Sequence, residues 1–160
     1  MNISISRLKE GREESFFDLY KEIANSDFEK WTKESKDRWF GVDYPLEYWK
    51  DLVRENKLPV FVALEDEIMV GYVVTEGINF GVVYLGWVGV LKSHRNLGIG
   101  KMLVSEVEKW SRANGMHKIE LETQESELKP YYESLGFEFE GLRKNSWQHL
   151  DNFMFGKSLH

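Results

Sequence analysis

The sequence predicts an α/β sandwich with a mixed sheet, formed by a single domain over residues 1–160. Apolar residues alternate at strand spacing in some segments and recur every three or four residues in others. Along the chain these segments follow the order strand, helices, three strands, helix, strand, helix, two strands, which is typical of helices packed on a mixed sheet. The 160 residues include only three prolines and no Pro/Gly/Ser-rich linker, so the pattern indicates no second domain.

The first third of the chain combines a short strand with helical and aromatic segments. Ile3 and Ile5 alternate with polar residues, which predicts a strand. Apolar residues fall three and four apart from Glu13 to Ala24, which predicts a helix, and a second helix is predicted from Leu46 to Glu55. The stretch from 25 to 56 also carries many aromatic residues among charges. These rings either pack in the core or form one wall of an acceptor site.

The middle of the chain is rich in strand patterns. Val60–Leu64 and Ile68–Thr75 flank a polar turn and are predicted to form a hairpin. Val82–Val90 is apolar on both faces, as a central strand should be. Gly86 and Gly89 within it indicate a bulge or a close backbone approach.

The last third predicts two helices and three strands. A helix is expected from Gly98 to Ala113, and Lys118–Thr123 alternates as a strand does. Pro130–Leu135 reads as a short helix, followed by strands over Phe137–Leu142 and Phe153–Lys157.

Charge and composition exclude several classes of function. Lys and Arg number 21 against 27 Asp and Glu, a net charge of −6, so no nucleic-acid partner is expected, whereas a cationic amine is compatible. No cysteine is present, which excludes disulfides, thiolate metal sites and a cysteine nucleophile. His117, His149 and His160 show no metal-binding spacing, so no metal is expected. No bilayer-spanning run and no signal peptide are visible, so the expected location is cytoplasmic, with no membrane partner.

The most informative segment links a strand to a helix through a glycine-bearing loop. Val88-Gly89-Val90 is followed, after four residues, by the segment Arg95–Lys101. The unpaired N–H groups and the dipole at a helix start favour an anion, and glycine lets a phosphate approach the backbone. Arg95 and Lys101 add positive charge, so the loop predicts a phosphate site.

Three phosphate-binding patterns compete for this loop. A Walker P-loop fails because Arg95 stands at its first glycine and Met102 at its Ser/Thr. A dinucleotide fingerprint fails because Leu103 takes its third glycine position. The third pattern, [RQ]-x-x-G-x-[GA] after a strand that ends in Val, matches at every position.

At these residues the sequence resembles the GNAT acetyltransferase superfamily, and the likeness continues downstream. The segment Tyr131–Phe137 is similar to the family's Y-E-x-L-G-F signature, and Glu120-Leu121-Glu122 stands on the preceding strand. Arg143-Lys144-Asn145 is similar to the ribosomal-protein alanine N-acetyltransferase branch. The motif-level resemblance covers about residues 82–142.

The resemblance implies a GNAT fold, in which a mostly antiparallel sheet of six to seven strands is splayed at its two central strands. Acetyl-CoA would lie between these strands and leave as coenzyme A. The implied cofactor-binding residues are Val88, Gly89, Val90 for pantetheine, Arg95, Asn96, Leu97, Gly98, Ile99, Gly100, Lys101 for the pyrophosphate, and Glu125 and Tyr132 downstream. Glu125 stands where the family often has an asparagine.

The resemblance also implies direct transfer of the acetyl group to an amine, because no cysteine can carry it. Tyr132 matches the general acid and Glu120 the general base, with Glu122 or a water relay as alternatives. The Val88 N–H is a candidate donor to the developing oxyanion. Pro130 predicts a helix that begins late, because proline disfavours helical angles at the preceding residue.

The predicted function is therefore an N-acetyltransferase that joins acetyl-CoA and a primary amine in a ternary complex. A CoA-binding regulatory module on the same fold, without turnover, is the alternative, and a nucleotide-binding module is a third hypothesis. The acceptor is a small molecule, a protein N-terminus or a lysine side chain. The protein is expected to be a monomer or a homodimer.

Overall fold

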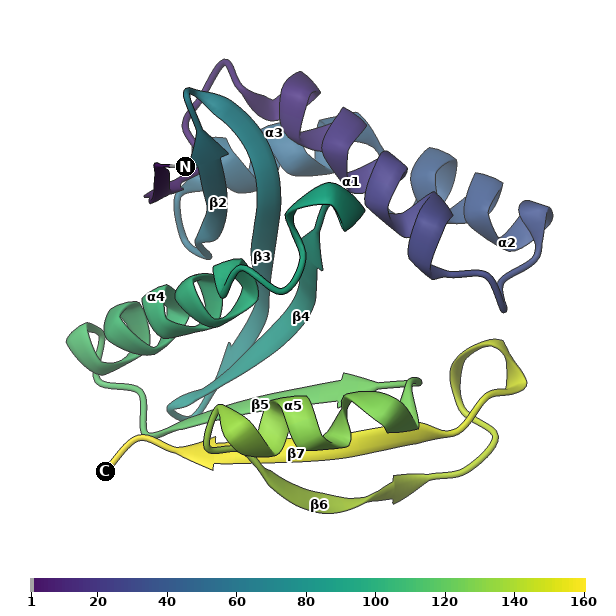
Figure 1. The fold of residues 1–160 in the computed structure, drawn as a ribbon, viewed down its shortest axis with the longest axis vertical. Coiled ribbons are helices and arrows are strands. Elements are labelled where there is room, and N and C mark those ends of the chain that lie inside the picture. Colours follow the sequence, from purple (N-terminus) through teal and green to yellow (C-terminus); the bar gives the residue numbers. More distant parts are fainter. Residues whose placement is uncertain (1) are drawn as a thin grey trace. The chain divides into compact units, whose positions relative to one another are not determined.

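The computed structural model describes residues 2–160 (Figure 1). Its strands are β1 (Ile3–Arg7), β2 (Val60–Glu65), β3 (Ile68–Asn79), β4 (Val82–Val90), β5 (Lys118–Thr123), β6 (Glu138–Arg143) and β7 (Asn152–Ser158). Its α-helices are α1 (Glu13–Asp27), α2 (Lys33–Arg38), α3 (Leu46–Glu55), α4 (Ile99–Ala113) and α5 (Lys129–Ser134). Within the described residues, no helix is both long enough and apolar enough to cross a bilayer.

The seven strands form one mixed sheet in the order β1-β2-β3-β4-β5-β7-β6. The pairs β1–β2, β2–β3, β5–β7 and β6–β7 are antiparallel, and β4 pairs with β5 in parallel from Val82↔Lys118 to Tyr84↔Glu120. The predicted class, an α/β fold with a mostly antiparallel mixed sheet, is confirmed.

The residues group into two compact units. The N-terminal unit comprises the chain up to Val74 together with Trp87–Val107, and the C-terminal unit comprises Thr75–Gly86 together with Glu108–His160.

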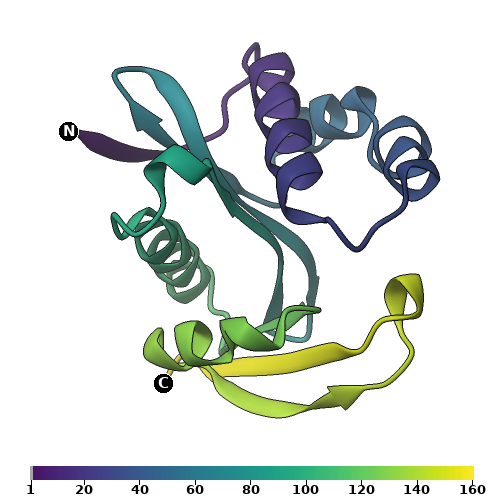
Figure 2. The same ribbon diagram turned by 45° about the vertical axis from the view of Figure 1, so that its right-hand side comes forward.

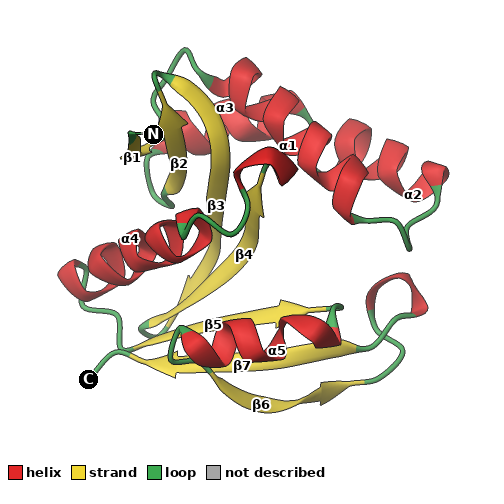
Figure 3. Cartoon of the chain, in the orientation of Figure 1, coloured by secondary structure: helices red, strands yellow, loops and turns green. Residues whose placement is uncertain are grey.

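In the N-terminal unit, helices cover both faces of the strands. Helices α1 and α3 pack side by side (Figure 3). Their buried rings meet the β3 side chain Tyr72, whose ring centroid lies 5.4 Å from that of Phe16. On the opposite face, a Cβ added at Gly71 would lie 3.4 Å from both Ile99 and Leu103 of α4. The alternation of side chains along a strand explains how β3 serves both layers.

The aromatic residues between 25 and 56 pack mainly against this core. Trp49 is fully buried and Trp31 nearly so. Trp39, Phe40, Tyr44 and Tyr48 are partly buried and rest on the same cluster. This arrangement favours the core-packing interpretation of the stretch.

The sequence pattern did not predict helix α2 or the π-helical turn Trp39–Asp43 that follows it. All side chains of α2 are polar and none is buried, so no apolar periodicity marks it. Local contacts stabilise it instead: the Thr32 hydroxyl accepts the Ser35 N–H at 3.1 Å, and Lys33 pairs with Asp37 at 2.5 Å. An N-cap and an i,i+4 ion pair suffice for a short exposed helix that packing does not define.

In the C-terminal unit, α5 lies along one side of the sheet formed by β5, β7 and β6 (Figure 2). The ring of Tyr132 on α5 lies 5.5 Å from that of Phe155 on β7, and Phe155 is paired with Leu121 on β5. Directly paired residues point to the same face, so Leu121 and Phe155 face α5. Glu120 and Glu122 stand on either side of Leu121 in the strand and therefore point to the opposite face.

The prediction that α5 begins late is wrong. The helix begins at Lys129, whose φ and ψ are −53° and −52°, with Pro130 as its next residue. A proline in the first turn loses no hydrogen bond, because first-turn N–H groups have no partner within the helix. A short 3-10 turn over Ser126–Leu128 leads into the helix and already sets helical angles.

Candidate active site

The loop from β4 to α4 contains a short 3-10 turn, Lys92–His94, followed by an exposed stretch up to Gly98. Asn96 and Gly98 both have positive φ angles, 63° and 79°. A Cβ at Gly98 would meet nothing within 4 Å, so glycine is needed there for its backbone angle and not for space. The Gly98 carbonyl accepts the Met102 N–H at 3.0 Å, which starts α4. Buried Ile99 fixes the start of the helix, while the loop residues from Arg95 to Gly98 and the side chain of Lys101 are exposed.

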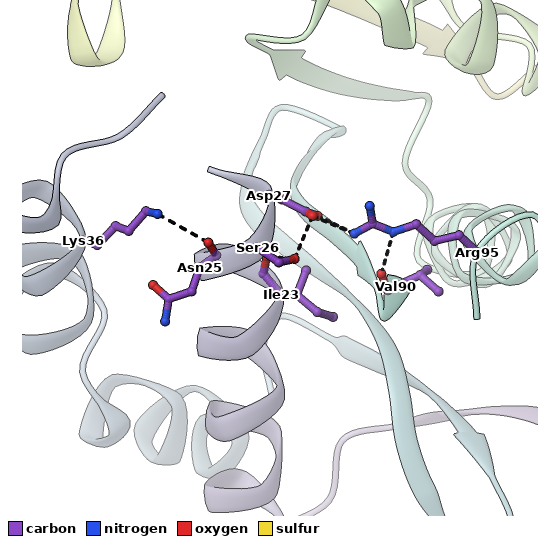
Figure 4. Close-up of polar contacts among 7 residues, drawn as sticks. All are labelled: Ile23, Asn25, Ser26, Asp27, Lys36, Val90 and Arg95. Carbon is purple, nitrogen blue, oxygen red and sulfur yellow. Dashed lines mark hydrogen bonds and ion pairs between the residues drawn. The ribbon is translucent and has the colours of Figure 1, made fainter. Parts of the chain in front are cut away.

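The guanidinium of Arg95 is already bound to other groups of the protein. Its Nη2 donates to both carboxylate oxygens of Asp27 at 2.6 and 2.8 Å, and its Nε donates to the Val90 carbonyl at 3.0 Å (Figure 4). The role of Arg95 in phosphate binding therefore stays a prediction. Lys101 keeps an exposed cationic side chain on the first turn of α4.

Gly89, in the predicted pantetheine-binding segment of β4, is closely surrounded. A Cβ at this position would lie 2.8 Å from the Tyr72 ring and 2.9 Å from Ile23. The sequence predicted a bulge or a close backbone approach here, whereas the nearest neighbours of such a Cβ are side chains. Val88 and Val90 flank it and are half-buried.

In the C-terminal unit, Tyr132 is buried, with 8% of its surface exposed. Its ring lies among Tyr131, Phe137 and Phe155 at centroid distances of 5.2, 6.0 and 5.5 Å. Burial, with a smaller contribution from Tyr131, raises the pKa of the Tyr132 phenol above its ordinary value. The hydroxyl is therefore protonated at neutral pH.

Glu120 and Glu122 share the face of β5 opposite α5, yet their surroundings differ. The Glu122 side chain is only 8% exposed; its oxygens receive Arg143 Nη1 at 2.8 Å and Asn152 Nδ2 at 2.7 Å. The Glu120 side chain is 42% exposed and has a Lys118 ammonium 3.1 Å from one oxygen. Glu120 thus keeps a carboxylate that a ligand can reach, whereas Glu122 is held by two donors.

Tyr84 is a neighbour of these carboxylates that the sequence reasoning did not identify. It is paired with Glu120 across β4 and β5, which places both side chains on one face. Burial first, and then the charges of Glu122 and Glu76, raise the pKa of the Tyr84 phenol. Because Tyr84 stands in an apolar strand run, the sequence did not indicate that it lies beside these carboxylates.

Glu125 lies in the loop between β5 and α5 and is half-buried. Its N–H donates to the Thr123 hydroxyl at 3.1 Å, and its carbonyl accepts the Leu128 N–H at 3.0 Å. These hydrogen bonds of the Glu125 main chain shape the loop. The predicted contact of the Glu125 side chain with the cofactor stays a prediction.

Asp27 and Asn152 are two further residues that sequence reasoning missed. Asp27 lies 68 positions from Arg95 in the chain, and no local pattern signals so distant a pair. Asn152 is fully buried. The sequence offered one indication that Asn152 is buried, namely its place next to the final apolar strand run.

A strand that enters a helix through this open glycine loop, on a seven-stranded mixed sheet, is the arrangement that defines acetyltransferases of the GNAT class. The sequence model of the acetyltransferase (GNAT) family matches residues 14–137. The chain belongs to that family.

Known proteins agree with this assignment. The chain is 24% identical over 130 residues to the aminoglycoside N(6')-acetyltransferase type 1 of Salmonella enteritidis, covering 74% of this chain and 90% of the relative. The fold is similar to that of the PaiA N-acetyltransferase of Thermoplasma acidophilum in complex with coenzyme A, with a TM-score of 0.84, 19% identity and 99% coverage of both chains.

Two further solved structures share the fold. One is YncA of Salmonella typhimurium with its cofactor acetyl-CoA, with a TM-score of 0.78, 18% identity and coverage of 100% of this chain and 95% of that one. The other is the ribosomal-protein-S18-alanine N-acetyltransferase of Escherichia coli, with a TM-score of 0.71, 16% identity and coverage of 99% and 94%.

Proposed function

We propose that this protein, acting as one domain over residues 1–160, transfers the acetyl group of acetyl-CoA directly to a primary amine in a ternary complex. The observation that carries the proposal is the β4–α4 loop. It matches the [RQ]-x-x-G-x-[GA] motif at Arg95, Gly98 and Gly100, and it opens the first turn of a 15-residue helix. Family membership supports the chemistry, and the structural relatives with coenzyme A and acetyl-CoA support the cofactor.

The loop residues fit the pyrophosphate of such a cofactor. Open space at Gly98 leaves its backbone accessible, and the N–H groups at the start of α4 point toward the helix end where an anion is favoured. The Lys101 ammonium adds a positive charge on the same turn. Asn96 to Lys101 would hold the diphosphate, and Val88 to Val90 would bind pantetheine through the main chain.

Tyr132 is the proposed proton donor. Acetyl-CoA supplies an activated acetyl group as a thioester, whose departing sulfur needs a proton. The raised pKa keeps the phenol protonated throughout the neutral range. A thiol has a pKa near ~8.5, so the phenol acts mainly as a hydrogen-bond donor and completes the transfer only as negative charge develops on sulfur.

Glu120 is the proposed proton acceptor for the incoming amine. An alkyl ammonium has a pKa of about 10.4, so the amine must lose a proton before it attacks. The more exposed carboxylate of Glu120 supports this role, because both oxygens of Glu122 are engaged by Arg143 and Asn152. Tyr132 packs on the face of the C-terminal sheet that α5 covers, and Glu120 lies on the other face, so the reacting thioester would have to reach both sides of this sheet.

The proposed acceptor is a cationic primary amine on a small molecule, a protein N-terminus or a lysine. The net charge of −6 favours a cationic partner. The Salmonella enteritidis relative acetylates an aminoglycoside, by its name, which supports a small polyamine-like acceptor as the first to test.

Turnover by Tyr132→Phe tests the assignment of the acid. With the best acceptor from an amine panel, kcat should fall at least about tenfold while the affinity for acetyl-CoA is kept. Tyr131→Phe is the matched control, because Tyr131 is the neighbouring tyrosine and is given no catalytic role. Equal turnover in wild type and Tyr132→Phe would remove Tyr132 from the mechanism.

A further inference from the structure

Asp27 breaks a local rule of helix stability. It is the last residue of α1, and no basic residue stands in the last turn of that helix. The carbonyl end of a helix carries partial negative charge, so a carboxylate there is unfavourable. When a residue opposes its local preference, a compensating contact or a function is expected. The compensating contact comes from Arg95, far along the chain.

The guanidinium of Arg95 contacts two other parts of the N-terminal unit. Nη2 reaches both oxygens of Asp27 at the end of α1, and Nε reaches the Val90 carbonyl at the end of β4 (Figure 4). The Ser26 hydroxyl lies 2.9 Å from Asp27 Oδ1, one of the two oxygens that Arg95 also contacts. The side chains of Arg95 and Asp27 are 37% and 32% exposed, so the pair is partly shielded from water.

The bond to Val90 fixes the direction in which the loop leaves the strand. The Leu91 N–H donates to the Val70 carbonyl on β3 at 2.9 Å. The C=O and N–H of a trans peptide point in opposite directions, so the Val90 carbonyl points away from β3. Arg95 Nε donates to this carbonyl and so holds the first residues of the loop against the end of the strand.

We infer that Asp27 and Arg95 form a positioning pair for the cofactor loop. Arg95 sets the course of the Asn96–Lys101 backbone by holding Val90 and Asp27, and it does not itself contact the phosphates. Asp27 is therefore a residue on which cofactor binding depends without touching the cofactor. The inference rests on the proposed function, because it concerns the loop that would bind acetyl-CoA.

Three substitutions separate a positioning pair from a phosphate ligand. Asp27→Asn should weaken coenzyme A binding about tenfold, as should Arg95→Ala, and the double variant should be no weaker than either single variant. Arg95→Lys should behave like Arg95→Ala, because an ammonium keeps the charge but cannot hold Val90 and Asp27 together. The matched control is Asp18→Asn, which makes the same charge change at an exposed site on α1.

The experiment measures coenzyme A affinity by calorimetry, together with KM for acetyl-CoA and kcat, on variants whose circular dichroism matches wild type. A positioning pair raises KM and leaves kcat at saturation unchanged. Tight binding by Asp27→Asn together with Arg95→Lys at wild-type level would overturn the inference, since Arg95 would then bind phosphate by charge. Absence of coenzyme A binding in wild type would instead refute the proposed function, and the inference with it.

Discussion

At the scale of single residues, Glu120 and Glu122 show how two identical side chains on one strand acquire different roles. Both were placed on one face by the alternation of β5, and that much followed from the sequence. Which of them is free to accept a proton depends on Arg143 and Asn152, which come from β6 and β7. No spacing rule along the chain identifies partners that only sheet pairing brings together.

Glu120→Gln should lower kcat by about 10²–10⁴-fold, because the amine loses its proton acceptor. The substitution keeps the size of a half-exposed side chain, so the free energy of unfolding should change by less than about 0.5 kcal/mol. Glu122→Gln should lower the free energy of unfolding more and kcat less. It weakens a charge-assisted contact that contributes about 1.5–3 kcal/mol at most to the free energy of unfolding. Steady-state kinetics and urea unfolding of the two variants measure both effects. Equal loss of kcat in both would argue against Glu120 as the particular base.

At the scale of elements, periodicity identified the helices and strands that bury an apolar face. The helix at 46–55 and the strands at 82–90 and 118–123 have the predicted bounds. Helix α2 was missed because its stability comes from a cap and charge pairs and not from burial. The start of α5 was misplaced because proline disfavours helical angles at the preceding residue. Lys129 nevertheless adopts them, since the 3-10 turn before it already has a helical course.

Strand β4 depends on glycine at position 89 for its packing. Gly89→Ala would place a methyl group 2.8 Å from the Tyr72 ring and 2.9 Å from Ile23, both buried. Overpacking of this kind costs typically about 1–3 kcal/mol, which urea unfolding would measure. Gly41→Ala is the control, because a Cβ there meets nothing within 4 Å and its φ is not positive. Similar stability of the two variants would contradict the close packing described for β4.

At the scale of the whole molecule, buried tyrosines link stability to alkaline pH. Burial raises the pKa of Tyr72, which is 2% exposed, and of Tyr132, which is 8% exposed. An unfolded tyrosine ionises at about pH 10, so the stabilisation is fully present below that pH and is lost as pH rises above it. The free energy of unfolding should fall by about 1.4 kcal/mol per pH unit for each tyrosine that stays protonated only in the folded state.

Urea unfolding between about pH 8 and about pH 11 measures this dependence, and the Tyr72→Phe variant isolates one contribution to it. The variant should lose less stability per pH unit than wild type above about pH 10. Identical slopes, or tyrosine absorbance that shows ionisation of all phenols near pH 10 in the folded protein, would contradict the burial assigned to Tyr72 and Tyr132.

The charges of the chain are unevenly distributed. The chain is acidic overall, with a net charge of −6, yet the β4–α4 loop carries Arg95 and Lys101. The sequence predicted both residues as phosphate ligands from their place in a motif. The structure pairs Arg95 with Asp27 at the end of α1, whereas the side chain of Lys101 is exposed on the first turn of α4. A motif specifies which residue types stand in a loop, whereas the fold decides which of them remain available.

The most direct test of the account is the fate of a labelled acetyl group. The protein is incubated with acetyl-CoA carrying carbon-13 at the carbonyl and with a panel of primary amines, aminoglycosides and peptides included, and the label is followed by NMR. We expect the label to move from the thioester to an acetamide, only when protein and acceptor are both present. Label that stays on coenzyme A with every amine, while calorimetry shows that acetyl-CoA binds, would contradict acetyl transfer and favour a CoA-binding regulatory module.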